Sequence, residues 1–215
     1  PIGTEAENES LSISHSLAAL VDHSLLVVEE DPDGEHSSRL LPTLRENETA
    51  RLSESGELSA CQRRLAEYLL DLAERAAPEL TGPQQLHWLQ LLARERENYR
   101  AALAWVIAEG QAALGLRLGA ALSWNWYLRG DYLEGSRWLE AALESGGDDP
   151  AALHGAGRFA LLTCRYARAE ELLARAHAAA RAAGDVRGEA NADQLLGSVA
   201  RERGDYARAR AYHQR

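Results

Sequence analysis

Three short segments of this sequence share a pattern, and their spacing constrains the fold more than any other feature. Gly-Asp-Tyr ends at Tyr132, Cys-Arg-Tyr ends at Tyr166, and a second Gly-Asp-Tyr ends at Tyr206, so the tyrosines are 34 and 40 residues apart. Self-similarity at a period of about 20 to 50 residues is typical of proteins built by stacking one small unit. The spacing therefore predicts a stacked array over residues 111–215.

Small residues recur at fixed distances from each of these tyrosines. They stand three residues after it (Gly135, Ala169, Ala209) and nine residues before it (Ser123, Gly157, Gly197). Two helices approach to 8–10 Å only where small side chains face each other, and Gly and Asp favour a tight turn. Each unit is thus predicted to be a pair of antiparallel helices. The alternative is an irregular helical bundle.

The composition supports a helical protein and excludes some functions. Ala, Leu, Arg and Glu dominate, and all of them favour helix. Every one of the 23 basic residues is arginine, so this chain cannot contain a P-loop with its phosphate-binding lysine. No apolar run approaches the roughly 18 residues that span a bilayer. Cys61 and Cys164 are far apart, which predicts reduced thiols in a cytoplasmic protein. Because Met is absent, we expect a piece of a longer protein, with the last repeat truncated.

Residues 58–110 are predicted to be helices that precede the repeats. Apolar residues follow helical spacing from Leu58 to Ala76, and this helix is expected to end near Pro78. A second apolar line runs from Leu86 to Val106, as one helix or as two helices that break within residues 94–98. We describe this segment as a helical linker or the first helical hairpins.

Residues 1–57 have a different pattern. A helix at 14–22, strands at 25–29 and 38–41, and a helix at 43–53 are predicted, in the order found in the second half of a winged helix. The first ten residues are acidic and are expected to be disordered. Residues 1–60 carry 13 acidic side chains against three arginines, so phosphate backbones are repelled and direct nucleic-acid binding by this segment is not expected.

Residues 11–215 resemble bacterial signal-transducing NTPases of the STAND, or NB-ARC-like, class. The resemblance lies in LAALVDHSLLVVEED, in GLRLGAALSWNWYLRGDYLEGSRWLEAAL and in the segment between them, while Leu196, Gly197 and Ala209 match the tetratricopeptide pattern. Such regulators combine an ATPase, a winged helix and C-terminal tetratricopeptide repeats. The resemblance implies a mainly α fold, a tetratricopeptide-like α-solenoid preceded by a small partial winged helix. It also implies an ATP- or ADP-binding domain before Pro1 and inducer-controlled self-association.

Candidate site residues follow by analogy with other tetratricopeptide domains, whose groove is lined by the second, fifth, ninth and twelfth residues of each repeat. For repeats starting at Leu116, Pro150 and Ala190, we predict a ligand or partner groove that contains Arg117, Trp124, Tyr127, His154, Arg158, Asn191, Gln194, Ser198 and Arg201. This mixture suits an extended peptide or an acidic or aromatic ligand. The alternative for each residue is an ordinary solvated or inter-repeat position.

No catalytic or metal-binding motif accompanies this groove. HExxH, GxSxG and Cys/His ligand spacings are absent from the sequence, so we expect no catalytic residue, metal or cofactor within this segment. The hypothesis is a non-catalytic regulatory segment of a larger ATPase-type transcriptional regulator. It would bind a protein or small-molecule inducer in the groove and contact the ATPase domain of the same chain. The alternative hypothesis is a scaffold that docks a protein partner without a nucleotide switch.

Overall fold

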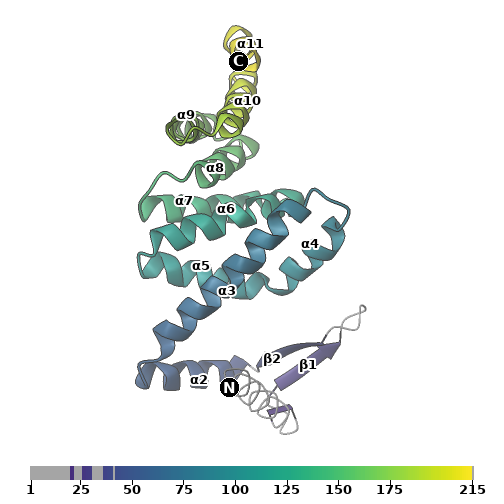
Figure 1. The fold of residues 1–215 in the computed structure, drawn as a ribbon, viewed down its shortest axis with the longest axis vertical. Coiled ribbons are helices and arrows are strands. Elements are labelled where there is room, and N and C mark those ends of the chain that lie inside the picture. The colour runs from purple at the N-terminus through teal and green to yellow at the C-terminus, as the bar shows by residue number, and fades with distance from the viewer. Residues whose placement is uncertain (1–19, 22–25, 31–35, 41, 215) are drawn as a thin grey trace, which may run out of the picture. The chain divides into compact units, whose positions relative to one another are not determined.

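The computed structural model describes residues 20–21, 26–30, 36–40 and 42–214 (Figure 1). Over these residues the chain is mainly helical, as predicted. It divides into two compact units, residues 1–61 and 62–215, and each unit is described by itself.

The first unit contains a β-hairpin and a helix. Strand β1 (Leu26–Glu30) pairs antiparallel with β2 (His36–Leu40), with Leu26 opposite Leu40, and helix α2 (Pro42–Glu54) follows. Both predicted strands and the predicted second helix are therefore present, with ends that differ by one or two residues.

Residues 31–35, between the two strands, lie outside the described residues, as does most of the predicted helix at 14–22. The winged helix accordingly stays a prediction.

The second unit consists of helices that follow one another along the chain. They are α3 (Leu58–Glu79), which begins in the first unit, α4 (Gln85–Arg94), α5 (Arg96–Ala108), α6 (Ala112–Arg129), α7 (Tyr132–Glu144), α8 (Pro150–Leu162), α9 (Tyr166–Ala182), α10 (Val186–Glu202) and α11 (Tyr206–His213). The break between α4 and α5 falls at Glu95, within the predicted range, so the two-helix alternative is the correct one.

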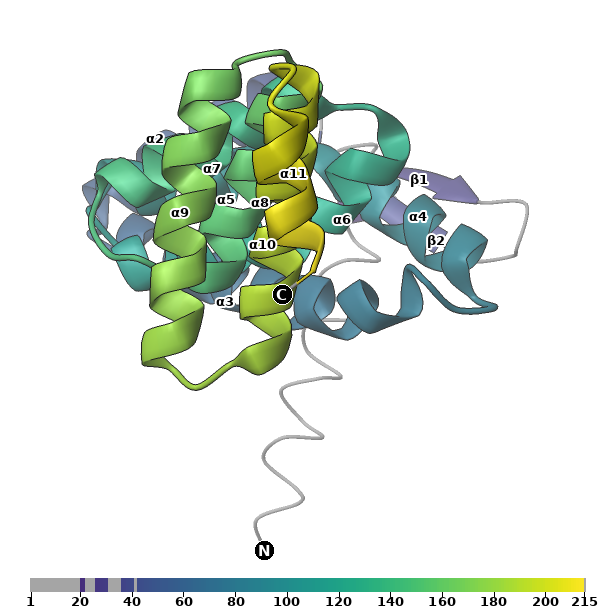
Figure 2. The same ribbon diagram turned by 90° about the horizontal axis from the view of Figure 1, so that it is seen from above.

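From α6 onward the helices form three hairpins: α6 with α7, α8 with α9, and α10 with α11. Each hairpin packs on the next, and the first helices α6, α8 and α10 contact one another in turn. Figure 2 shows α9, α10 and α11 side by side at one end of this stack. The described part of the unit is thus solenoid-like, as the tyrosine spacing predicted.

The turn inside each hairpin has the same left-handed residue and the same backbone hydrogen bond, and the three tyrosines occupy equivalent positions. Each tyrosine is the first residue of the second helix of its hairpin. Two residues earlier the backbone is left-handed, with φ of 76° at Gly130, 58° at Cys164 and 81° at Gly204. The next amide in each turn donates to the carbonyl five residues back, at 2.9, 2.8 and 2.9 Å. This hydrogen bond and the left-handed residue define a Schellman motif, which ends a helix sharply.

Small residues are required where the two helices of a hairpin cross. A Cβ added to Gly157 would lie 2.6 Å from Leu173 Cγ, and one added to Gly197 would lie 2.5 Å from His213. Real side chains do not approach that closely, so these glycines let the helix axes come together. The longer spacing between Tyr166 and Tyr206 is taken up by longer helices, because α9 and α10 have 17 residues each whereas α7 and α8 have 13.

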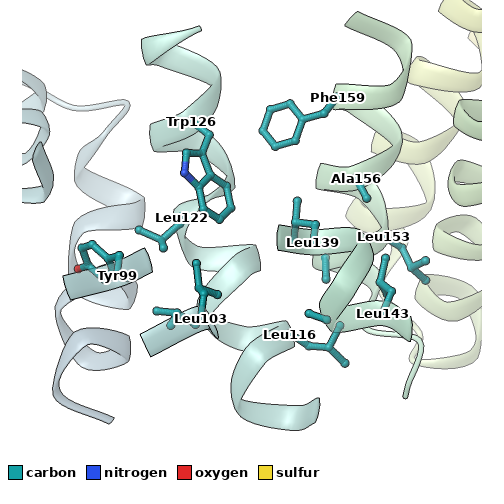
Figure 3. Close-up of a cluster of buried hydrophobic side chains, with 14 of the residues drawn as sticks. Tyr99, Leu103, Leu116, Leu122, Trp126, Leu139, Leu143, Leu153, Ala156 and Phe159 are labelled. Carbon is teal, nitrogen blue, oxygen red and sulfur yellow. The ribbon is translucent and has the colours of Figure 1, made fainter. Parts of the chain in front are cut away.

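The hydrophobic core of the second unit runs continuously from α3 to α10. Figure 3 shows Leu122 and Trp126 of α6, Leu139 of α7 and Phe159 of α8 converging within it. Phe159 is fully buried, and its ring lies 6.5 Å from Trp126 and 6.1 Å from Tyr132 between centroids. One aromatic ring therefore joins two successive hairpins.

Glutamates on the second helices hold neighbouring elements together through paired arginines. Glu134 of α7 binds Arg96 and Arg100 of α5 at 2.7–2.8 Å, and Arg100 makes two parallel hydrogen bonds to it. Glu140 of α7 binds Arg165 and Arg168 at 2.9 Å. We call each such glutamate with its two arginines a carboxylate clip.

A third carboxylate clip joins α9 to the last hairpin. Glu170 binds Arg203 at 2.6 Å and Arg208 at 2.5 Å. The clips explain part of the exclusive use of arginine, because its planar fork can bind a carboxylate with two hydrogen bonds and lysine cannot.

Candidate functional site

All nine predicted groove residues belong to the first helices of the three hairpins, α6, α8 and α10. Helix α6 contacts α8, and α8 contacts α10. Four of the nine predicted residues come together there: Trp124 and Tyr127 of α6, with His154 and Arg158 of α8. We call these four the arginine–aromatic cluster.

Stacking organises this cluster. The rings of Trp124 and Tyr127 are nearly parallel, at 24°, with centroids 4.7 Å apart. The guanidinium carbon of Arg158 lies 5.0 Å from the centroid of Trp124 and 5.5 Å from that of Tyr127. Both distances fall within the range in which a cation is attracted to an aromatic face.

His154 occupies the edge of the cluster and links it to α10. Arg158 Nη2 is 3.3 Å from His154 Nδ1. A guanidinium can only donate, so Nδ1 accepts, and the proton of the neutral ring is on Nε2. The pKa of His154 is lowered to about 4, first by burial and then by the charge of Arg158, while a hydrogen bond with the Asn191 backbone partly opposes both. His154 is therefore uncharged at neutral pH.

Arg158 is a half-buried cation without a matching anion. Among the described residues, no carboxylate oxygen lies within 4.0 Å of its nitrogen atoms. Burial lowers the pKa of its guanidinium, and the neighbouring Tyr127 partly opposes this effect. The cluster consequently presents a positive charge on a mostly aromatic surface.

A hollow of about 170 Å³ adjoins the cluster at His154. Its walls are formed by the start of α8 and the start of α10: Pro150, Ala151, His154, Asp185, Arg187, Gly188 and Asn191. Asp185 accepts a hydrogen bond from the Gly188 amide at 2.9 Å, which caps α10. Asn191, predicted as a groove residue, therefore lines this hollow.

Four predicted residues join neither the cluster nor the hollow: Arg117, Gln194, Ser198 and Arg201. Arg117 binds Glu74 of α3 through both carboxylate oxygens, at 2.8 and 2.9 Å. Arg201 is exposed and pairs with Glu202 at 3.2 Å. Ser198 donates its hydroxyl to the backbone oxygen of Gln194 at 3.1 Å. The side chains of Arg117, Ser198 and Arg201 are thus engaged by their own surroundings, and the role of these residues and of Gln194 in binding stays a prediction.

Two residues near the site were not predicted from the sequence. Tyr132 was recognised only as a turn marker, yet its ring lies 6.1 Å from that of Tyr127 and connects the cluster to Phe159. Arg187 lines the hollow and is exposed. A count from the start of α10 at Val186, instead of from Ala190, would have included Arg187.

In the part of the chain that the structure describes, no three His, Cys, Asp or Glu side chains are grouped to hold a metal ion. No helix in that part is both long and apolar enough to cross a membrane. Neither Cys61 nor Cys164 forms a disulfide bond.

No family model matches the chain. It is similar, however, to three proteins named "Putative HTH-type transcriptional regulator", one from Mycobacterium bovis and two from strains of Mycobacterium tuberculosis. In each case 32% of residues are identical over 146 residues, which is 66% of this chain and 16% of the relative. The chain thus resembles a limited part of much longer transcriptional regulators.

Proposed function

We propose that this chain is a non-catalytic regulatory segment of a larger transcriptional regulator, and that the face formed by α6, α8 and α10 binds a protein or small-molecule ligand. The similarity to HTH-type transcriptional regulators supports the regulatory context. The observation that carries the binding role is Arg158, which is half-buried against two aromatic rings and has no carboxylate of the described residues beside it. Removing a charge from water is costly unless an opposite charge compensates. A bound ligand would supply that charge.

The parent protein is proposed to work as a switch. The resemblance to signal-transducing NTPases supports an ATPase domain that binds ATP or ADP, an acidic winged helix that contacts it, and repeats of the tetratricopeptide kind. In this switch the repeats pack against the ATPase domain in two alternative arrangements. A ligand that binds one arrangement more tightly than the other would shift the population toward it and so control self-association. In this proposal the parent acts in the cytoplasm, and the present segment does not touch nucleic acid.

Transcript levels in cells that carry variants of the full-length regulator test the binding role. The test variant is Trp124→Ala with Arg158→Ala, and the matched control is Arg137→Ala, whose guanidinium lies 4.5 Å from Trp138 on α7, away from the site. We expect the double variant to lose regulation of its target genes at normal protein levels. Normal regulation in the double variant would overturn the proposal.

A comparison of nucleotide states separates the switch from the scaffold alternative. The full-length protein is loaded with ATP or ADP, and co-purified partners and oligomeric state are measured. A switch requires that the two nucleotides favour different states, by roughly 10-fold or more in population. Identical partners and oligomers in both states would favour the scaffold.

A further inference from the structure

Arg158 differs from the arginines that surround it in the fold. Arg100, Arg168 and Arg208 all bind carboxylates from another helix at 2.5–2.9 Å. Arg158 is at least as buried as these, yet its one hydrogen bond in the described part of the chain is to His154. Because a guanidinium has five N–H donors, most of its hydrogen-bonding capacity has no acceptor among the residues that the structure describes.

The neighbours of Arg158 cannot neutralise it. His154 is uncharged, and its Nδ1 already accepts from Arg158. Trp124 and Tyr127 offer only the negative faces of their rings, which attract a cation by about 0.5–1 kcal/mol at an exposed site and more when desolvated. The arrangement holds the guanidinium in place and leaves its outer donors available. An incoming carboxylate would complete the site with charge-assisted hydrogen bonds.

The shape of the surface indicates what kind of molecule carries that carboxylate. The hollow at His154 is about 170 Å³, whereas pockets that enclose small molecules measure about 300–1,000 Å³. The hollow can hold one side chain of a bound peptide, while the rest of that peptide extends along the protein surface. Arg187, on the rim, adds a second positive charge, and no carboxylate oxygen among the described residues lies within 4.0 Å of it.

We propose that the arginine–aromatic cluster binds an acidic segment of a protein partner, in which an Asp or Glu carboxylate pairs with Arg158 while the flanking residues pack on Trp124 and Tyr127. This inference rests on the proposed function of the α6–α8–α10 face and specifies its ligand. It requires a side-chain carboxylate within an extended peptide.

Selection from a random peptide library on phage tests the proposal with the 215-residue chain. Clones are kept if they bind the wild type and Arg137→Ala but not the Trp124→Ala, Arg158→Ala double variant. We expect the kept peptides to be enriched in Asp and Glu. The tightest is then synthesised in two forms, as selected and with Asn or Gln replacing its acids, and both are titrated by calorimetry.

The acidic peptide should bind the wild type about 10- to 100-fold more tightly than the neutral peptide, as expected for a hydrogen-bonded ion pair. With Arg158→Gln the two peptides should bind alike, and Arg158→Lys should give an intermediate preference, because lysine keeps the charge and loses the fork. Because both peptides are compared on the wild-type protein, misfolding of a variant cannot account for a difference between their affinities.

The contrary outcomes are distinct. Peptides that depend on the cluster but contain no acids would overturn this inference and leave the proposed function standing. Failure to select any cluster-dependent peptide would overturn this inference, whereas the proposed function is decided separately by the transcript levels of the Trp124→Ala, Arg158→Ala variant. Binding of N-acetylglutamate amide as tight as that of the whole peptide would overturn the protein-segment assignment, because the contacts with Trp124 and Tyr127 would then contribute nothing.

Discussion

The contact between Gly135 and Phe159 offers a quantitative test of the helical stack. A Cβ added to Gly135 would lie 2.5 Å from Phe159 Cε2 and 3.0 Å from Trp126 Cε3. Phe159 has 0% exposure, so its ring cannot move out of the way into solvent. The glycine on α7 therefore makes room for a ring that belongs to the next hairpin.

Each single substitution has a calculable cost. Gly135→Ala introduces a clash of about 1–3 kcal/mol, offset by about 1 kcal/mol because alanine is the better helix former. Phe159→Ala leaves a cavity and should cost about 3–5 kcal/mol. In the double variant the alanine methyl group enters space left by the ring, so the clash with Phe159 disappears and only the milder contact with Trp126 remains. The double variant should therefore be more stable than the sum of the single effects by about 1–3 kcal/mol.

Urea unfolding followed by circular dichroism gives the four free energies of this cycle. A matched control combines Phe159→Ala with Gly204→Ala, since Gly204 lies in a different hairpin and has no heavy atom within 4 Å of its would-be Cβ. That pair should be additive within about 0.5 kcal/mol. Additivity of Gly135→Ala and Phe159→Ala would refute the packing of α7 against α8 on which the stack depends.

Three further predictions concern the turns, the site and the clips. Cys164→Gly should stabilise the protein by about 0.5–1 kcal/mol in urea, because it relieves a left-handed backbone at φ 58°, and Gly130→Ala should do the reverse; a destabilised Cys164→Gly variant would contradict this. His154 should titrate near 4 in its NMR spectrum, and Arg158→Gln should raise that pKa. In the unfolded chain the pKa of this histidine is near 6.5, so the unfolded state binds the proton more readily than the folded state. The free energy of unfolding should therefore fall by about 3 kcal/mol as pH drops from 6.5 to 4. A measured pKa near 6.5 for His154 in the folded wild-type protein would refute its burial. The pKa of Glu134 is lowered to about 2, first by the hydrogen bond from Arg100. The stability that its carboxylate contributes is therefore present above about pH 4.5 and is lost as pH falls toward 2. Glu134→Gln should remove about 1–2 kcal/mol after screening of the partly exposed arginines, and an unchanged midpoint at pH 7 would contradict the clip.

Most of the repeat architecture could be predicted from local chemistry. Turn residues and small side chains act within a single hairpin, so the spacing of Tyr132, Tyr166 and Tyr206 located the starts of α7, α9 and α11. The break at Glu95 was predicted only as one of two alternatives, because apolar periodicity continues through it. The helix expected at 14–22 lies largely outside the described residues.

The candidate site could be predicted less completely, because it depends on contacts between elements. Counting positions within each repeat selected Trp124, Tyr127 and Arg158, which the stack brings together. The same count selected Arg117, which instead binds Glu74. That pair joins residues 43 apart in sequence, and no local pattern reveals which face of α3 meets α6. The carboxylate clips were missed for the same reason.

The carboxylate clips also make the flexibility of the array depend on ionic strength. Charge pairs at partly exposed positions weaken as salt screens them, whereas apolar packing between hairpins persists or strengthens. Adding salt would loosen the row of second helices while the contacts along α6, α8 and α10 hold. The array would thus bend more easily in concentrated electrolyte, and its curvature would respond to the ionic conditions around it.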